Sequence, residues 1–323
     1  MYKRVLFWLG NSRLFSLPMT IMSWLVVFIY ALKDGGNILN GILALIGIAF
    51  AHLATNLFDD YVDYRTLSKE TAFKENNEKS KCSYIKEGKA TLNELLKVVI
   101  IYCSIAFIIG IILTFRSGLG VVLLALIGGC IVLTYAKLSS NGFSELAVGT
   151  AFGPLLFEGT YYVMCKKFSP EVFILSIAVV VFTVGLVYMN NVLDYEKDIE
   201  CGKKSLCCRL GDTNLIATGL VVLYSVGYLM CFVLMFWFKN IFYCLPLITV
   251  ILVYQLYNSV KTFYADKNNI PEIKWWNFPM GNKTNIIKSG TTPFYFRLYF
   301  ARNIMIWFSA FIIFAIFMQN SQA

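Results

Sequence analysis

Two short segments of the chain place aspartates and asparagines on one face of a helix. At about 100° per residue, the members of each segment fall within roughly a third of the helix circumference. They are Asn56, Asp59, Asp60 and Asp63 in the first acidic segment, and Asn191, Asp194 and Asp198 in the second acidic segment. Carboxylates this close repel one another, and at a membrane helix end they are costly unless cations compensate. Oxygen ligands without a neighbouring His or Cys favour Mg²⁺, which also takes phosphate oxygens. Both segments therefore predict a magnesium site for a phosphorylated substrate.

Basic residues follow each acidic segment and are candidates for binding phosphate. They are Lys79, Lys81, Lys86 and Lys89 after the first segment, and Lys203, Lys204 and Arg209 after the second. Each lysine taken alone is equally typical of the charge that membrane proteins carry on their inner side. The Asn-x-x-Asp spacing of the first segment recurs in the second, so the chain contains a short internal repeat of the pattern.

The elements that must position these residues are apolar runs long enough to cross a bilayer, which needs roughly 20 residues per helix. The runs cover approximately 14–32, 37–57, 95–115, 118–136, 145–164, 170–190, 213–237, 240–258 and 302–320. With 58% hydrophobic and only 15% charged residues, the composition is not that of a soluble domain. We expect one all-α integral membrane domain over residues 1–323, with about nine transmembrane helices. The acidic segments end the second and sixth runs and so reach the same side of the membrane.

The distribution of basic residues predicts the orientation of these helices. With the amino terminus inside, 23 of the 28 Lys and Arg residues lie on the inner side. The five on the outer side are Lys33, Arg116, Lys166, Lys167 and Lys239. The amino terminus is therefore expected in the cytoplasm and the carboxyl tail outside.

Polar loops on the inner side are expected at 59–94, 191–212 and 259–301. Function usually lies in such loops, because the helices between them serve as a scaffold. The third loop contains Lys274-Trp275-Trp276-Asn277-Phe278, aromatic and basic residues typical of an anchor in the headgroup layer.

Other patterns exclude several classes of site. A net charge of +9 could attract nucleic acid, but the basic residues lie between apolar runs, as membrane topology requires, and nucleic-acid binding is not expected. Nine cysteines without metal-ligand spacing, and one histidine, indicate neither a zinc site nor a disulfide framework. The long first run, without a small-residue cleavage site, predicts a retained helix instead of a signal peptide.

The second acidic segment continues into a longer motif that resembles the UbiA superfamily of membrane prenyltransferases. The matching residues are NNVLDYEKDIECGKKSL at 190–206, followed by Arg209-Leu210-Gly211. The segment KCSYIKEGKATL at 81–92 is similar to the loop of this family that leads into its third helix. Ser144-Glu145, FGPL at 152–155 and GTYY at 159–162 look like the branch that prenylates 1,4-dihydroxy-2-naphthoate in bacterial menaquinone synthesis. The resemblance covers about residues 10–260.

The resemblance implies a bundle of two pseudo-repeated four-helix halves plus one helix, in a bacterial inner membrane. It also implies transfer of a polyprenyl group from its diphosphate to an aromatic acceptor, with carbon dioxide loss giving demethylmenaquinone if the acceptor is the naphthoate. In this family Mg²⁺ would be held by Asn56, Asp59, Asp60, Asp63, Asp194 and Asp198. Asp60, Asp63, Asp194 and Asp198 would be catalytic. The substrate-binding residues would be Asn56, Asn191, Lys81, Lys203, Lys204 and Arg209. No obligate protein partner is expected, and His52, one turn before Asn56, fits a packing or hydrogen-bonding role better than that of an acceptor-side base.

Three departures from the family pattern concern the ligand set and the acceptor. Leu193 stands where the family often has Arg, and Asp59-Asp60 stands where an Asn-Asp pair is common. A further acidic residue is expected beyond the first segment, and Glu70 and Glu75 are its candidates.

Alternatives to the naphthoate acceptor are another phenolic acid, a porphyrin side chain or a glycerol phosphate. A membrane cation transporter would also carry acidic residues on helices, but near the bilayer midplane. A CDP-alcohol phosphotransferase would need Asp-Gly and Ala-Arg within one motif, and neither pair occurs around 59–75. Neither the prenyl chain length nor the oligomeric state follows from the sequence.

Overall fold

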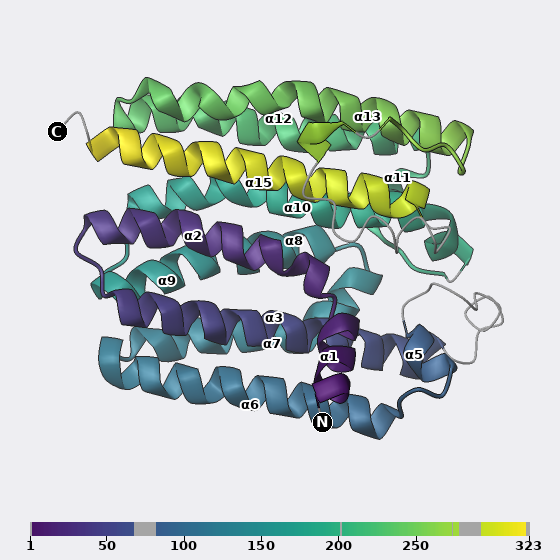
Figure 1. The fold of residues 1–323 in the computed structure, drawn as a ribbon, viewed down its shortest axis with the longest axis horizontal. Helices are drawn as coiled ribbons and strands as arrows, with labels where there is room; N and C mark the ends of the chain where they lie inside the picture. The colour runs from purple at the N-terminus through teal and green to yellow at the C-terminus, as the bar shows by residue number, and fades with distance from the viewer. Residues whose placement is uncertain (1, 68–81, 201, 273, 278–291, 321–323) are drawn as a thin grey trace.

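The structure is a computed structural model that describes residues 2–67, 82–200, 202–272, 274–277 and 292–320. Every regular element in these ranges is helical, and the long helices run side by side (Figure 1). Eight helices are long and apolar enough to cross a membrane. They are α2 (Leu17–Lys33) preceded by η1 (Leu14–Ser16), α3 (Ile38–Leu67), α6 (Leu92–Ser117), α7 (Gly120–Ser140), α10 (Pro170–Glu200), α12 (Thr213–Phe238), η3 (Ile241–Thr249) joined to α13 (Val250–Ala265), and α15 (Thr292–Asn320).

The predicted run 145–164 is present as a broken helix. It is built from α8 (Ser144–Thr150), the π-helical turn η2 (Ala151–Leu155) and α9 (Leu156–Cys165). Gly153 has non-helical dihedrals, and Pro154 has no backbone N–H to continue the helical hydrogen bonds. A Cβ atom on Gly153 would lie 3.0 Å from Val180 of α10, so glycine lets the break pack closely against that helix. All nine predicted runs are therefore found among the described residues.

The chain forms the all-α membrane bundle that the sequence predicts. The first four crossings are α2, α3, α6 and α7, and the next four are the broken helix, α10, α12 and η3–α13. The ninth, α15, lies between the two groups and packs against α2, α10 and η3 (Figure 1). The central helix is α10, whose apolar window is 78% buried inside the protein. This places the second acidic segment at the end of the most enclosed helix.

Close approach of helices to α10 depends on small residues. A Cβ atom on Gly185 of α10 would lie 2.6 Å from the Tyr224 ring of α12, and one on Gly227 of α12 would lie 2.5 Å from the Phe182 ring. A glycine on each helix thus leaves room for an aromatic ring of the other helix. Such pairing is typical of membrane helices, where packing replaces the hydrophobic effect as the driving force.

Short helices cover the end of the bundle that carries the acidic segments. They are α5 (Ser83–Lys86) and α11 (Leu206–Leu210), whereas η4 (Trp275–Asn277) packs against the side of α15, and α1 (Tyr2–Asn11) lies across α3 and α6 (Figure 1). Trp8 of α1 is buried among Leu57 and Leu95, and Arg4 contacts Glu94 at 2.7 Å. Glu94 also completes a capping box with Thr91 that starts α6. The amino-terminal helix is therefore packed onto the first half of the bundle.

Several helices extend further than the sequence predicted. The second and sixth runs were expected to end at 57 and 190, whereas α3 continues to Leu67 and α10 to Glu200. The last run was expected from 302, whereas α15 begins at Thr292. The hydrocarbon core is about 30 Å thick, and a 30-residue helix at 1.5 Å per residue is about 45 Å long. The polar ends of these helices extend past the membrane core, so the hydropathy pattern alone ends them too early.

Candidate active site

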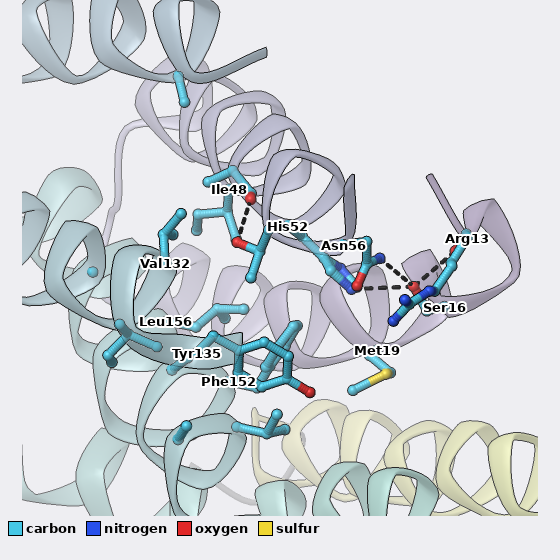
Figure 2. A pocket seen from close by; sticks show the side chains of 18 of the residues that line it. Arg13, Ser16, Met19, Ile48, His52, Asn56, Val132, Tyr135, Phe152 and Leu156 are labelled. Carbon is cyan, nitrogen blue, oxygen red and sulfur yellow. Dashed lines mark hydrogen bonds between the residues drawn. The ribbon is translucent and has the colours of Figure 1, made fainter. Parts of the chain in front are cut away.

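A cavity of about 1400 Å³ lies among α3, α6, α7, the broken helix and α10, and side chains of both acidic segments line it. Asp60 and Asp63 line one side of its polar end, and Asp194 and Asp198 line the other. The remainder of the wall is apolar and includes Ala44, Ile48, Leu113, Val121 and Leu156, some of which are seen in Figure 2. The cavity therefore joins a charged end to a long apolar interior.

The depth of this interior matches the membrane. Along α3 the lining residues extend from Asp63 back to Ala44. At a rise of 1.5 Å per residue, this distance is about 28 Å, close to the thickness of the hydrocarbon core. An apolar chain could lie in the cavity across almost the whole bilayer.

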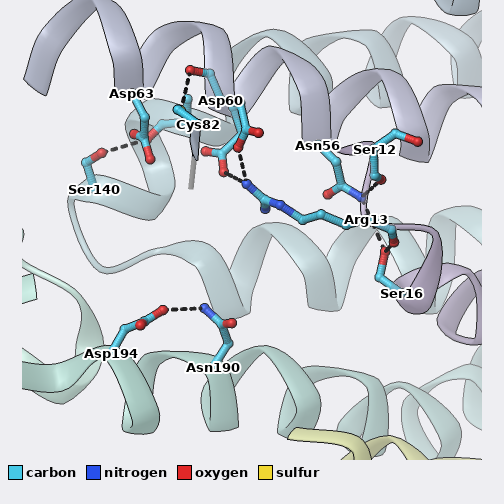
Figure 3. Close-up of polar contacts among 12 residues, drawn as sticks. Ser12, Arg13, Ser16, Asn56, Asp60, Asp63, Cys82, Ser140, Asn190 and Asp194 are labelled. Atoms are coloured by element: carbon cyan, nitrogen blue, oxygen red, sulfur yellow. Dashed lines mark hydrogen bonds and ion pairs between the residues drawn. The ribbon is translucent and has the colours of Figure 1, made fainter. Parts of the chain in front are cut away.

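The first acidic segment contacts a cation that the sequence did not indicate. Asp59, Asp60 and Asp63 are all buried, as expected for carboxylates that share one face of α3. The Arg13 guanidinium donates to the Asp59 carboxylate at 3.1 Å and to the Asp60 carboxylate at 2.5 Å (Figure 3). Burial by itself would lower the pKa of Arg13, but the two carboxylates outweigh it and hold this pKa above its ordinary value. Arg13 is therefore a permanent positive charge at the polar end of the cavity.

Asp60 has a further donor in Tyr84 of α5, whose hydroxyl lies 3.2 Å from the second carboxylate oxygen. Burial and the neighbouring carboxylate raise the pKa of Tyr84 above its ordinary value, so the phenol keeps its proton and donates a hydrogen bond to Asp60. The orientation of Asp60 is thus set by groups from α1–α2 and α5.

Arg13 is held in place by the turn between α1 and η1. Its backbone is left-handed, with φ at 60°, which turns the chain sharply before α2. The Asn56 amide donates to the Ser12 carbonyl at 3.0 Å and to the Ser16 hydroxyl at 3.2 Å, which ties this turn to α3 (Figure 3). The predicted role of Asn56 as a metal ligand or substrate-binding residue stays a prediction, and in the structure its nitrogen positions the turn.

His52 contacts the same connection. Its two ring nitrogens lie 3.1 Å from the Ser16 hydroxyl (Figure 2) and 2.8 Å from the Thr20 hydroxyl. Because both nitrogens have hydroxyl partners, the structure supports the hydrogen-bonding role that the sequence favours for this residue.

A lysine joins the two acidic segments. The Lys203 ammonium lies 3.5 Å from a carboxylate oxygen of Asp63 and 3.9 Å from one of Asp198. Asp194, on the helix facing α3, accepts a hydrogen bond of 3.2 Å from Asn190 (Figure 3). Carboxylates 135 positions apart in the chain are thus brought within reach of one cation, as the internal repeat predicts.

Three predicted binding residues on the second acidic segment and its loop have other partners. The Asn191 amide borders the cavity but donates to the Glu145 carboxylate at 2.7 Å. Arg209 is exposed, donates to the Asn141 carbonyl and stacks over Phe143, outside the cavity lining. Lys204 is exposed as well, and its backbone N–H donates to the Ser140 carbonyl.

Of the basic residues after the first acidic segment, Lys86 lies in α5 and Lys89 pairs with Glu87. Lys79 and Lys81, and the candidate carboxylates Glu70 and Glu75, lie outside the described residues.

The donor set at the cavity fits Mg²⁺ held together with phosphate. In the described ranges no three His, Cys, Asp or Glu side chains converge as a ready-made metal group. The carboxylates instead reach the cavity from two helices, and Arg13 and Lys203 balance part of their charge. Since Mg²⁺ takes one or two carboxylates plus water and phosphate oxygens, this arrangement suits an ion that arrives with its substrate. The ligand set remains a prediction. The eight described cysteines are all free thiols.

Arg13 and Tyr84 are the residues that sequence reasoning missed. Arg13 was counted only as one of the topology charges before the first helix. The position of Arg13 at the inner start of the first helix could have indicated its role. The second helix runs antiparallel to the first and therefore ends, with its acidic segment, on the same side of the membrane. Tyr84 had no such signal, because its distance from Asp60 depends on how α5 folds back.

The fold has close structural counterparts. An apo UbiA homologue from Aeropyrum pernix superimposes with a TM-score of 0.61 at 16% identity, over 91% of this chain and 97% of that one. A UbiA homologue from Archaeoglobus fulgidus, solved with GPP and Mg²⁺, superimposes with a TM-score of 0.57 at 12% identity, over 92% and 99%. At such identities the likeness shows a shared fold.

Sequence comparison gives the family. A 1,4-dihydroxy-2-naphthoate octaprenyltransferase of Bacillus subtilis is 22% identical over 57% of this chain and 59% of that protein. The Escherichia coli protein of the same name is 24% identical over 64% of this chain and 69% of its own length. The model of the UbiA prenyltransferase family matches residues 17–278, most of the chain. This chain is therefore a multi-pass integral membrane protein of the UbiA prenyltransferase family.

Proposed function

We propose that this protein transfers a polyprenyl group from polyprenyl diphosphate to an aromatic acceptor at the cytoplasmic side of a bacterial inner membrane. The observation that carries the proposal is the cavity, which joins acidic and basic side chains at one end to an apolar interior about as deep as the membrane core. A substrate with a diphosphate head and a long hydrocarbon tail has the same division of polarity.

The polar end would bind the diphosphate. Asp60 and Asp63 on one side, and Asp194 and Asp198 on the other, would hold Mg²⁺, with Asn56 and Asp59 as further ligands. Bound Mg²⁺ supplies Lewis-acid stabilisation of the negative charge on the departing diphosphate. Lys203 lies between the two acidic segments and would add a preorganised positive charge to the same leaving group.

The apolar part of the cavity would protect the reaction. Breaking the carbon–oxygen bond of the donor leaves an allylic cation, which water would quench. Residues such as Phe152 and Leu156 line the wall beyond the polar end and keep this region dry. The cation is then available to a ring carbon of the acceptor.

The acceptor proposed here is 1,4-dihydroxy-2-naphthoate. Support comes from three relatives named for this substrate, at 22%, 24% and 25% identity. The new bond would form at the ring carbon that carries the carboxylate, whose carbon–carbon bond electrons return to the ring as carbon dioxide leaves. The product would be the quinol form of demethylmenaquinone. The family membership disfavours a cation transporter.

A magnesium-dependent assay of purified protein tests the proposal. Octaprenyl diphosphate and 1,4-dihydroxy-2-naphthoate are supplied, and lipid product is measured for wild type, Asp63→Asn and Asp194→Asn. Each substitution should lower the rate at least about 100-fold, because it removes a carboxylate that would hold the Mg²⁺ stabilising the leaving diphosphate. The control is Glu196→Gln on the same helix, whose exposed carboxylate pairs with Lys267 outside the cavity and should change little.

Prenylation of another phenolic acid but not of the naphthoate would keep the site and replace the acceptor. If folded wild-type protein transferred no prenyl group to any acceptor, the proposed activity would be wrong.

A further inference from the structure

A second cavity lies at the end of the bundle opposite the acidic segments. Its volume is about 420 Å³, and it lies where α2, α9, α12 and α15 end and α10 begins. Glu171 of α10 lines it, whereas Asp194 is 23 residues further along the same helix, about 35 Å away at the helical rise. The short helices α5 and α11 are at the other end of the molecule (Figure 1). This second cavity, which we call the far cavity, is therefore separate from the candidate active site.

Two carboxylates line the far cavity, Asp34 at the end of α2 and Glu171 at the start of α10. Asp34 accepts a hydrogen bond from the Tyr161 hydroxyl, and Glu171 accepts one from the Ser169 hydroxyl at 2.5 Å. The Lys167 ammonium lies 3.8 Å from Asp34, a loose contact for an exposed lysine. Because a carboxylate accepts about four hydrogen bonds, both groups can accept more than they do in the structure.

Tyr30 adds an oxygen that has no partner. This residue lines the far cavity and is only 8% exposed. Within the described part of the chain its hydroxyl makes no hydrogen bond, although a buried phenol usually makes one. Tyr30 is close enough to interact electrostatically with both Asp34 and Glu171. Three oxygen-bearing side chains thus border the same space, and a ligand with several N–H groups would satisfy all of them.

Aromatic rings and a lysine complete the lining. The rings of Tyr30 and Tyr161 lie 6.2 Å apart, and the faces of such rings attract cations. Lys239, at the end of α12, is exposed. Trp237 and Phe168 also line the cavity and are 51% and 53% exposed, as is typical of side chains in the headgroup layer. The far cavity therefore combines acceptors for a cation with basic and amphipathic residues at the membrane surface.

We propose that the far cavity binds the head group of an aminophospholipid of the phosphatidylethanolamine type. The primary ammonium has three N–H donors, and these would bind the oxygens of Asp34, Glu171 and Tyr30. The phosphodiester would lie against Lys239 and Lys167, and the ammonium would take the place of Lys167 on Asp34. The acyl chains would then continue past the exposed aromatic side chains into the bilayer.

Other ligands match this lining less well. A choline head group has no N–H donor for the carboxylates or for Tyr30, and phosphatidylglycerol brings no cation to them. A bare metal ion would leave Lys167 and Lys239 without an anion. The zwitterion matches both signs of charge at once.

Native mass spectrometry of the detergent-purified protein tests the site. Phosphatidylethanolamine, phosphatidylcholine and phosphatidylglycerol with identical acyl chains are titrated separately, and the Kd of each is measured. Phosphatidylethanolamine should bind wild type about tenfold or more tightly than either of the others, because only its head group makes the charge-assisted hydrogen bonds.

Two variants with matched controls locate the binding. Glu171→Gln should raise the Kd for phosphatidylethanolamine about tenfold, and Lys239→Gln about threefold, since an exposed charge contributes less. The first control is Glu158→Gln, a half-buried carboxylate outside the lining that accepts from the Ser169 backbone N–H. The second is Lys166→Gln, which changes an exposed lysine with the same left-handed backbone as Lys239. Neither control should change the Kd.

A second measurement uses stability. Because a ligand that binds the folded state stabilises it, added phosphatidylethanolamine should raise the thermal unfolding temperature of wild type more than that of Glu171→Gln. Without added lipid, both proteins should unfold at the same temperature, which shows that the variant is folded.

The contrary outcomes are distinct. Equal Kd values for the three lipids, or an unchanged Kd in folded Glu171→Gln, would overturn the proposal. Free phosphoethanolamine that bound as tightly as the whole lipid would replace the lipid by a soluble ligand and overturn it as well. None of these measurements involves turnover, so the result is independent of the proposed prenyl transfer.

Discussion

Arginine and lysine have different parts in balancing the acidic site. The planar guanidinium of Arg13 contacts two carboxylates at 3.1 and 2.5 Å, which is the kind of fixed geometry that arginine provides. Lys203 is a point charge on a flexible stem, and its contacts at 3.5 and 3.9 Å are looser. Arg13 is therefore suited to holding carboxylates in fixed positions, whereas Lys203 is suited to binding a substrate that enters the site.

Lys203 and Lys204 are neighbours whose environments predict different effects. Lys203→Gln removes the positive charge between Asp63 and Asp198 and should lower kcat/KM for prenyl transfer about 100-fold, a typical loss for one preorganised charge. Lys203→Arg should recover part of the rate. Steady-state kinetics with a varied prenyl diphosphate concentration measures both.

The matched variant is Lys204→Gln, which changes an exposed side chain outside the cavity lining. It should lower kcat/KM far less. If kcat/KM fell equally in the two variants, the proposal that Lys203 but not Lys204 contacts the diphosphate would be wrong.

At the scale of the elements, α10 supplies both the rigid centre of the bundle and the second acidic segment. Its 31 residues cross the membrane and continue beyond it, so Asp194 and Asp198 are held by the same helix that packs on α12 and α15. The glycine-to-ring contacts between α10 and α12 fix this helix in position. Disturbing them would affect the site from a distance.

Gly185→Val tests this packing. The added side chain would collide with the Tyr224 ring, since a Cβ atom alone would be 2.6 Å from it. The free energy of unfolding, measured by denaturant titration in mixed micelles, should fall by about 1–3 kcal/mol, the usual cost of overpacking.

Gly110→Val is the matched control, because it makes the same change in another membrane helix at a position with no atom within 4 Å. Its unfolding free energy should stay close to that of wild type. If both variants were equally destabilised, helix–helix contact at Gly185 would not be the reason.

At the scale of the whole molecule, contacts between protein side chains connect the two halves of the bundle. Asp59 and Asp60 have Arg13 as a partner, and Lys203 connects Asp63 with Asp198. α15 joins the two groups of helices through apolar packing. We therefore expect folding and metal binding to be separable.

Removal of divalent ions should therefore stop turnover without loosening the fold. After chelation with EDTA we expect prenyl transfer to vanish and added Mg²⁺ to restore it, while the thermal unfolding temperature in detergent stays the same. A large drop in that temperature on chelation would show that a metal ion is part of the folded structure. Activity and unfolding are measured on the same samples.

The sequence by itself determined the membrane architecture and the acidic faces. Runs of bilayer length are local patterns, so all nine crossings could be predicted, including the broken one at 144–165. The positions of Asp60, Asp63, Asp194 and Asp198 on helix faces follow from the helical period, and the structure places all four on the cavity wall. Helix ends were predicted too early, because hydropathy reports where the hydrocarbon ends and not where the backbone hydrogen bonds end.

Only the tertiary structure decided which side chains meet. Arg13 reaches Asp59 and Asp60 because the turn before α2 folds onto α3, and Lys203, just after α10, reaches Asp63 because α10 faces α3 across the cavity. Lys204 and Arg209, which the motif groups with Lys203, are exposed outside the cavity lining. The cavity likewise depends on the spacing between helices. The physical reason is that hydropathy and period are properties of neighbouring residues, whereas contacts across the bundle are set by packing between helices distant in the chain.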